Sequence, residues 1–214
     1  HAVGHEIMSP LQSLMVLHPA PEDPSHRYIQ RMQQAVRVLY GQASPSEAFA
    51  ASQVPVQTLD LATFLRHVAD NAPHAGIADV RLRHADGAAA LERPHPVLAD
   101  EYALEDVITH ILRNADRFRT PGSPIVITLE PPREGLVRWR IENEGPAIAP
   151  DQLERIFEYG VSAEPSTGAS HRGQGLFVAR TYMAKMGGTV QALERDGGAG
   201  FELALRHEGR TGGD

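Results

Sequence analysis

The sequence predicts an α+β fold, in which an N-terminal antiparallel helical hairpin is followed by an α/β sandwich with a mixed sheet. Two observations predict it. Apolar residues recur every three or four positions on both sides of a proline-rich segment, which indicates two helices joined by a loop. Beyond residue 57, short apolar runs typical of strands alternate with amphipathic helical segments, which favours helices on one face of a sheet.

The first predicted domain covers residues 1–54. Residues 1–17 carry a helical apolar stripe, and residues 25–42 carry a heptad-like seam. Residues 18–24 contain three prolines, so they cannot continue a helix. Because a lone hairpin of this size cannot bury both seams well, we expect two copies to pair as a homodimer, each supplying half of a four-helix bundle.

The second predicted domain covers residues 58–214, after a small, polar stretch at 43–57 that is typical of a linker. Glycine-rich residues 160–173 are expected to form a loop. Helices are expected at 61–71, 104–118, 152–157 and 176–186, and strands at 80–84, 96–99, 125–129, 136–141, 189–194 and 200–206.

Composition excludes several classes of protein. The 214 residues are 42% hydrophobic, which is enough for a packed core. A net charge of −7 argues against a nucleic-acid partner, and the absence of cysteine excludes disulfides and thiolate metal sites. No apolar stretch approaches the roughly 18 residues of a membrane span. We expect a cytoplasmic fragment of a longer protein, free or belonging to a membrane-bound sensor, with any membrane contact made by segments outside this chain.

The segment from His5 to Leu11 has the pattern of a reactive histidine. Pro10 crowds the carbonyl of Glu6 four residues back, so a bend is expected just after His5. Ser9 shares a helix face with His5. A neutral imidazole is a nucleophile near neutral pH, and a neighbouring carboxylate can hold the proton of its other nitrogen. With eleven histidines in the chain, a solvated helical histidine is the alternative.

The helix predicted at 104–118 carries polar groups suited to a nucleotide. Asn114 offers an oxygen ligand of the kind that Mg²⁺ prefers, and Arg117 can reach phosphates. Phe118 can stack on a base. An ordinary amphipathic helix with a polar face is the favoured explanation of these residues when they are taken alone.

Two glycine segments complete the pattern. Gly145 follows a predicted strand and permits a close backbone approach, and Asn143 beside it offers an acceptor oxygen. Gly173 and Gly175 precede the last predicted helix, where backbone amides and the helix dipole favour phosphate. Either segment alone is weak evidence for a nucleotide site.

Together these segments resemble the motifs of bacterial sensor histidine kinases. The segment from His5 to Leu11 matches the phosphoacceptor box, His-Glu-x-x-(Thr/Ser/Asn)-Pro-Leu, at every defined position. Residues 110–118 resemble the asparagine box, residues 142–148 the Asp-x-Gly-x-Gly box, and residues 156–176 the phenylalanine box, ATP lid and last glycine box. The resemblance covers nearly the whole chain, and four motifs in order are far more specific than one.

The resemblance implies a dimerisation and phosphotransfer hairpin joined to an ATP-binding domain of the Bergerat fold, which type II topoisomerases and heat-shock chaperones share. It implies that His5 is autophosphorylated from Mg²⁺-ATP with Glu6 as acid/base partner, and that the phosphoryl group passes to an aspartate of a response regulator. Ser9 falls where the family often places a residue that positions water for dephosphorylating the regulator, so the family's phosphatase activity is also expected.

The resemblance also implies the binding residues. Mg²⁺ would be held by Asn114 and His110. ATP would be bound by Asn114, Arg117, Phe118, Asn143, Gly145, Ala147, Ile148, Gly173, Gly175 and Leu176.

Several positions depart from the family pattern. Asn143 stands where the family has an aspartate that reads adenine, Ala147 replaces the second glycine of that box, and His171 replaces the first glycine of the last box. These departures motivate an alternative, a degenerate kinase that acts as a dimeric binding or scaffold module with weak or no ATP binding. A second alternative is an ATP-dependent enzyme of the same superfamily without a histidine acceptor.

Overall fold

A computed structural model of the chain describes residues 54–158 and 175–209. These residues belong to one unit, Val54–Asp214. The predictions for the helical hairpin and for the loop at 160–173 therefore lie outside the described residues. The same holds for the site residues His5, Glu6, Ser9 and Gly173, and for His171.

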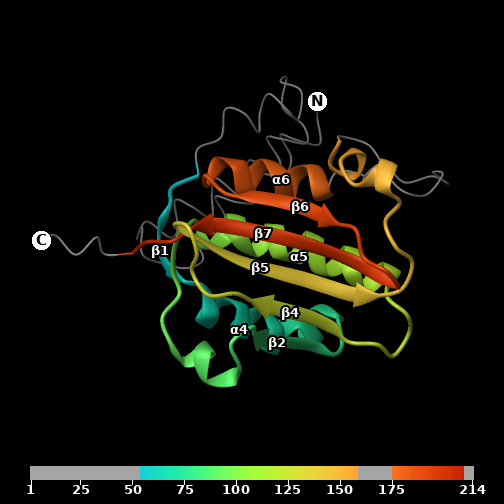
Figure 1. Cartoon of the computed structure of the whole chain (residues 1–214), viewed down its shortest axis with the longest axis horizontal. Coiled ribbons are helices and arrows are strands. Elements are labelled where there is room, and N and C mark those ends of the chain that lie inside the picture. The colour runs from blue at the N-terminus through green and yellow to red at the C-terminus, as the bar shows by residue number, and fades with distance from the viewer. Residues whose placement is uncertain (1–53, 159–174, 210–214) are drawn as a thin grey trace, which may run out of the picture. The chain divides into compact units, whose positions relative to one another are not determined.

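A mixed five-stranded sheet is the centre of the described unit (Figure 1). Strand β2 runs parallel to β4, and the other neighbours are antiparallel. The mixed sheet predicted from the sequence is confirmed. Across the sheet the strands lie in the order β2 (Val80–His84), β4 (Ile125–Leu129), β5 (Leu136–Glu144), β7 (Gly198–Arg206) and β6 (Thr189–Leu193).

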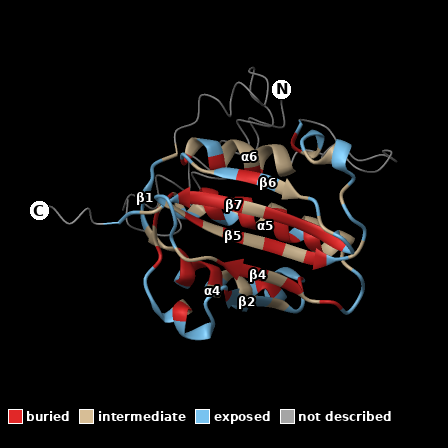
Figure 2. Ribbon diagram, viewed as in Figure 1, coloured by how far each residue is buried: buried red, intermediate tan, exposed pale blue. Residues whose placement is uncertain are grey.

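One face of this sheet forms the core. Alternate residues of β5 are fully buried, including Trp139 and Ile141, because successive side chains of a strand point to opposite faces. Figure 2 shows that β7 and β4 are buried along most of their length. Three helices accompany the sheet: α4 (Leu61–Asn71), α5 (Glu101–Phe118) and α6 (Gly175–Lys185).

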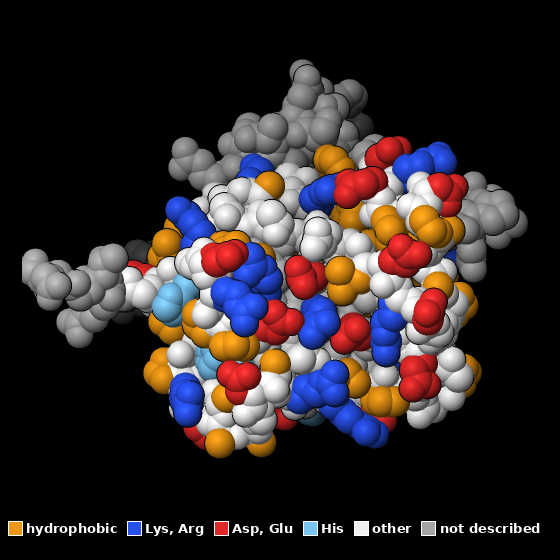
Figure 3. All heavy atoms as spheres, viewed as in Figure 1, with side chains coloured by type: hydrophobic (Ala, Val, Ile, Leu, Met, Phe, Trp, Pro, Cys, Tyr) orange, Lys and Arg blue, Asp and Glu red, His pale blue; other side chains and the backbone are white. Residues whose placement is uncertain are grey.

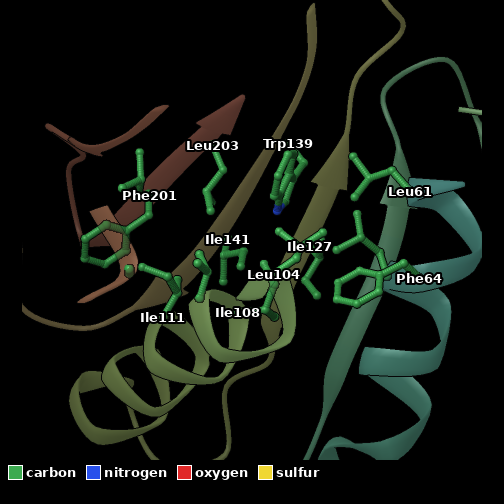
Figure 4. Close-up of a cluster of buried hydrophobic side chains, with 14 of the residues drawn as sticks. Leu61, Phe64, Leu104, Ile108, Ile111, Ile127, Trp139, Ile141, Phe201 and Leu203 are labelled. Carbon is green, nitrogen blue, oxygen red and sulfur yellow. The ribbon is translucent and has the colours of Figure 1, made fainter. Parts of the chain in front are cut away.

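Helix α5 provides most of the helical side of the core. Figure 4 shows Leu104, Ile108 and Ile111 of α5 facing Ile141 and Trp139 of β5. The side chain of Asp100 accepts a hydrogen bond from the Ala103 amide at 2.8 Å and so caps the helix. The observed helix therefore begins three residues before the predicted start at residue 104.

The opposite face of the sheet carries charged side chains. Figure 3, viewed from this side, shows positive and negative groups intermixed over it. Several are paired: Arg140 lies 3.1 Å from Glu130, and Arg195 lies 3.5 Å from Glu142. This mixed, polar face is the side of the sheet away from the helices, and it is called the open face below.

A short ribbon was not fully predicted. Strand β1 (Gln57–Asp60) pairs antiparallel with β3 (Pro96–Ala99), and an isolated bridge between Val97 and His207 joins the ribbon to the end of β7. Only β3 was expected. Strand β1 has one apolar residue, Leu59, among its four and so gives no apolar run, and its partner lies far along the sequence.

The helix predicted at 152–157 is wrong. The segment forms two 3₁₀ turns instead, η3 (Pro150–Gln152) and η4 (Arg155–Phe157). Phe157 is buried and meets Phe201 of β7 edge-on, with ring centroids 6.1 Å apart, so tertiary packing rather than helix periodicity fixes the segment. Two further 3₁₀ turns are η1 (Ala72–Ala75) and η2 (Ala88–Glu92).

Candidate functional site

The C-terminal half of α5 carries four of the predicted site residues. His110 and Asn114 are half-buried and lie one turn apart, so they share a helix face. Arg117 is exposed, and its guanidinium carbon lies 5.2 Å from the centroid of the Phe118 ring. These residues flank the apolar stripe that packs on the sheet, so the core fixes the helix that presents them.

His110 is held in its neutral form. Burial lowers the pKa of its imidazole below the ordinary value of 6.5, Asp106 opposes this shift, and Arg113 adds to it. At pH 7 the ring is therefore neutral, and one of its nitrogens can accept a hydrogen bond or bind a metal.

Asn143 lies near the end of β5 with its side chain buried, at 2% exposure. Its side-chain nitrogen donates to the carbonyl oxygen of Glu144 at 3.1 Å. The side-chain nitrogen is therefore used in a hydrogen bond within the protein, and the side-chain oxygen is the atom of the amide that can accept one. An acceptor is the group needed to read the amino group of adenine.

Gly145 brings the end of β5 against the end of α5. Its φ is 142°, and a Cβ there would overlap the carbonyl oxygen of Phe118. The amide of Thr120 donates to the carbonyl of Glu144 at 2.8 Å and closes the same contact. Two motifs distant in sequence are therefore joined at one point.

Gly175 brings the start of α6 against the middle of α5. A Cβ at Gly175 would lie 2.9 Å from Nδ1 of His110, closer than side-chain carbons approach other atoms, so the His110 ring would have to shift to admit any other residue. Leu176 packs half-buried against the core. The predicted phosphate-binding segment thus ends beside His110.

Of the remaining predicted residues, Ala147 is exposed and Ile148 packs half-buried against the core. Both follow Gly145 in irregular backbone. Of the described site residues, His110, Phe118, Gly145 and Gly175 make the contacts that join three sequence motifs around α5.

Sequence reasoning missed two arginines at this site. Arg119 pairs with Asp116 at 2.7 Å and donates to the carbonyls of Ala78 and Ser123, which fixes the end of α5. Arg195 donates to the carbonyl of Asn143 at 3.1 Å. The only signal for Arg195 was its place in a polar, glycine-containing turn between two strands, and for Arg119 there was none.

The donor set of the site fits a cation held partly by a ligand. Within the described residues, no three or more His, Asp and Glu side chains converge as a metal site. Asn114 supplies an oxygen, which suits Mg²⁺ because that ion prefers oxygen ligands and usually keeps waters and substrate phosphates in its shell. His110 supplies a nitrogen, a donor more typical of softer metals, so it is the weaker of the two predicted ligands.

Comparison with known proteins agrees with this arrangement. Residues 99–209 match the family described as histidine kinase-, DNA gyrase B-, and HSP90-like ATPase. The sensor protein SrrB of Staphylococcus aureus is 30% identical over 105 residues, which are 48% of this chain and 18% of SrrB. The chain thus spans about a fifth of the length of that relative. None of the described helices is long and apolar enough to cross a membrane.

Solved structures share the fold. Full-length ShkA in complex with AMPPNP has a TM-score of 0.62 at 24% identity, over 95% of this chain and 44% of ShkA. ThkA in complex with the response regulator TrrA has a TM-score of 0.61 at 18% identity, over 95% of this chain and 57% of ThkA. The mycobacterial kinase MprB has a TM-score of 0.58 at 18% identity, over 71% of this chain and 97% of MprB.

The family match spans α5, the end of β5 and the start of α6, the three segments that meet at the site. The resemblance to a sensor histidine kinase catalytic core is confirmed, and the chain belongs to the family of histidine kinase-, DNA gyrase B- and HSP90-like ATPases.

Proposed function

We propose that this chain is a sensor histidine kinase core that phosphorylates its own His5 from Mg²⁺-ATP and passes the phosphoryl group to an aspartate of a response regulator. The observation that carries the proposal is the meeting of three motif segments around the C-terminal half of α5. The names of the relatives support it: SrrB is a sensor protein, and ThkA was solved with a response regulator.

In this proposal, adenine lies at the end of β5. The side-chain oxygen of Asn143 accepts from the adenine amino group, and Phe118 stacks on the base. Gly145, Ala147 and Ile148 form the backbone beside it, where a bulkier residue at 145 would overlap the end of α5.

The phosphates lie toward the start of α6. Backbone amides at Gly173, Gly175 and Leu176 face them, because the first turn of a helix leaves its amides unpaired. Arg117, exposed on α5, reaches the same phosphates as a cation.

Mg²⁺, when bound, neutralises charge on the phosphates. Asn114 offers its side-chain oxygen to the ion, and His110 offers a ring nitrogen that burial keeps free of a second proton.

Phosphoryl transfer then involves His5 and Glu6. A ring nitrogen of His5 forms a bond to the γ-phosphorus while the bond from that phosphorus to the bridging oxygen of ADP breaks. Glu6 takes the proton of the other ring nitrogen and so stabilises the phosphorylated ring. Positioning and cations supply most of the rate enhancement in such a transfer.

The partners follow from the same proposal. Two copies pair through their hairpins, and the receiver domain of a response regulator accepts the phosphoryl group. Ser9 positions the water that hydrolyses the phosphoryl group from that regulator. A Ser9 substitution that leaves dephosphorylation of the regulator unchanged would argue against this role of Ser9.

Radiolabelled ATP tests the kinase reaction. We expect an acid-labile, base-stable phosphoprotein that requires ATP and magnesium and is absent from His5→Ala. His26→Ala serves as the matched control and is expected to label normally. Acid-labile label that persists in His5→Ala would sink the assignment of His5.

The alternative of a degenerate kinase is favoured by one observation, the neutral Asn143 where the family has aspartate. Calorimetry with a non-hydrolysable ATP analogue separates the two readings, because millimolar or absent binding would favour the binding module. We expect the wild type to bind the analogue. Asn143→Asp is expected to bind it about fivefold more tightly, because a carboxylate makes a charge-assisted bond to the adenine amino group, and Asn143→Ala is expected to bind it much more weakly.

Steady phosphate release without any phosphoprotein would instead favour the ATPase that lacks a histidine acceptor. The same labelled-ATP experiment reports this outcome directly.

A further inference from the structure

The turn between β6 and β7 sits directly on the end of β5. Nη1 of Arg195 donates to the carbonyl oxygen of Asn143 at 3.1 Å, and Nε lies 3.5 Å from a carboxylate oxygen of Glu142. One guanidinium therefore contacts two consecutive residues of β5 from a turn 52 positions later in the sequence.

Backbone contacts lock the same turn in place. The amide of Gly145 donates to the carbonyl of Gly197 at 3.1 Å. A Cβ at Gly198 would overlap the carbonyl oxygen of Asn143 and lie 3.1 Å from Nη1 of Arg195. The turn thus lies against β5 closely enough that glycine is required.

Arg195 and the Asn143 side chain lie on opposite faces of the sheet. Glu142 and Asn143 are successive strand residues, so their side chains point to opposite sides. Arg195 pairs with Glu142 on the open face, while the Asn143 side chain is buried on the helix face. Arg195 therefore touches Asn143 only through its backbone.

The backbone at Asn143 pairs with Ile125 of β4 and Ala199 of β7, and further hydrogen bonds add to this strand pairing just after the residue. Arg195 holds the carbonyl of Asn143, and Thr120 holds the carbonyl of Glu144, which itself accepts from the Asn143 side chain. Without Arg195, the strand pairing and the Thr120 and Gly197 contacts still keep the segment folded, but the carbonyl of Asn143 loses the donor that Arg195 supplies.

We propose that Arg195 is a positioning residue that aligns the Asn143 side chain for adenine and so sets the preference of this site for ATP over GTP. The inference rests on the proposed function, because Asn143 must read the base. The ion pair with Glu142 contributes little by itself, since the Arg195 side chain is 36% exposed. The effect comes from the direction in which Asn143 points.

Calorimetry on the full chain with non-hydrolysable ATP and GTP analogues tests the inference. For Arg195→Ala we expect a dissociation constant for the ATP analogue about threefold to tenfold higher, with that of the GTP analogue unchanged. The ratio of the GTP constant to the ATP constant, which measures the preference for ATP, therefore falls by the same factor. Arg195→Lys, which keeps the charge but not the two-pronged contact, is expected to fall between. Thermal unfolding is measured in parallel to show that each variant is folded.

Arg138→Ala is the matched control. Arg138 lies on the same face of β5 and donates to the carbonyl of Arg133 at 3.5 Å, away from Asn143. Arg138→Ala is expected to keep the wild-type ratio of the GTP constant to the ATP constant. An unchanged ratio in Arg195→Ala, or equal weakening of both analogues, overturns the inference alone, whereas a wild type that binds neither analogue overturns the proposed function as well.

Discussion

At the scale of single residues, the site depends on contacts that only glycine permits. Gly145 combines a positive φ with a Cα that lies against the carbonyl of Phe118, so a side chain there meets both backbone strain and overlap. Gly122 also has a positive φ, of 81°, but faces open space. The two positions therefore separate the effect of strain from the effect of crowding.

We predict that Gly145→Ala lowers the free energy of unfolding by about 2 to 4 kcal/mol, the sum of strain and overpacking. Gly122→Ala is expected to cost only about 1 kcal/mol, from strain alone. Urea denaturation of both variants measures the difference. Equal losses in the two proteins would show that the contact with Phe118 has no energetic weight.

Single residues also show where sequence reasoning ends. The chemistry of Asn114 and Asn143 could be inferred from residue type, spacing and family resemblance. Arg195 could not, because its role depends on a carbonyl 52 positions away, and no local pattern marks which strand a turn will touch. Pair contacts across a sheet are set by topology, which one sequence does not display.

At the scale of elements, a buried histidine pair joins β2 to the segment before β3. Nε2 of His84 lies 3.0 Å from Nε2 of His95, and the two residues are 6% and 3% exposed. The amide of Asp86 donates to Nδ1 of His84, and Nδ1 of His95 lies 2.8 Å from the carbonyl of Arg93. These partners require His84 to donate and His95 to accept, so both rings are neutral.

The pair predicts a pH-dependent stability. Burial, followed by the neighbouring His95, lowers the pKa of His84 below 6.5, while Asp86 opposes the shift and Arg93 adds to it. The unfolded chain therefore binds a proton more readily than the folded chain. Stability is full above pH 6.5 and falls as the pH drops below that value, with a slope of at most about 1.4 kcal/mol per pH unit for one proton.

Denaturation between pH 7.5 and 5.5 measures this slope. We expect His84→Gln, which keeps a donor toward His95 but cannot take up a proton, to reduce the slope and leave the share due to His110, whose pKa is also lowered by burial. His67→Gln, at an exposed position of α4, is expected to leave it as in the wild type. A wild-type slope retained in His84→Gln would contradict the role of the pair.

Whole elements were predictable where they carry their own pattern. Helix α4 and strands β2, β3 and β4 have the bounds that apolar periodicity predicted. The 3₁₀ turns η3 and η4 were mistaken for a helix because the burial of Phe157 against Phe201 is a tertiary contact. The ribbon strand β1 was missed because its four residues include one apolar residue, Leu59, whereas the equally short β3 is an apolar run.

At the scale of the whole described unit, one core joins the sheet to its helices. Trp139, the chain's only tryptophan, is fully buried, and Figure 4 shows it among Leu61, Phe64 and Leu203. Every residue labelled around it belongs to the second unit, Val54–Asp214. The labelled neighbours of the indole are thus all supplied by the second unit.

We predict that a fragment of residues 54–214 folds by itself and gives the same blue-shifted tryptophan emission as the full chain. Urea should shift both emissions to the red in one cooperative transition, because the indole then enters water. Trp139→Phe serves as the spectroscopic blank. Emission at the unfolded wavelength from the fragment in buffer would contradict an independent core.

The contact between His110 and Gly175 has a consequence for substitutions at both positions. The histidine occupies the space that a Cβ at position 175 would need, so these two positions, 65 residues apart, share one fixed volume. A smaller side chain at 110, such as asparagine, would release that volume. The two positions should therefore be coupled, so that Gly175→Ala is tolerated better beside asparagine at 110 than beside histidine.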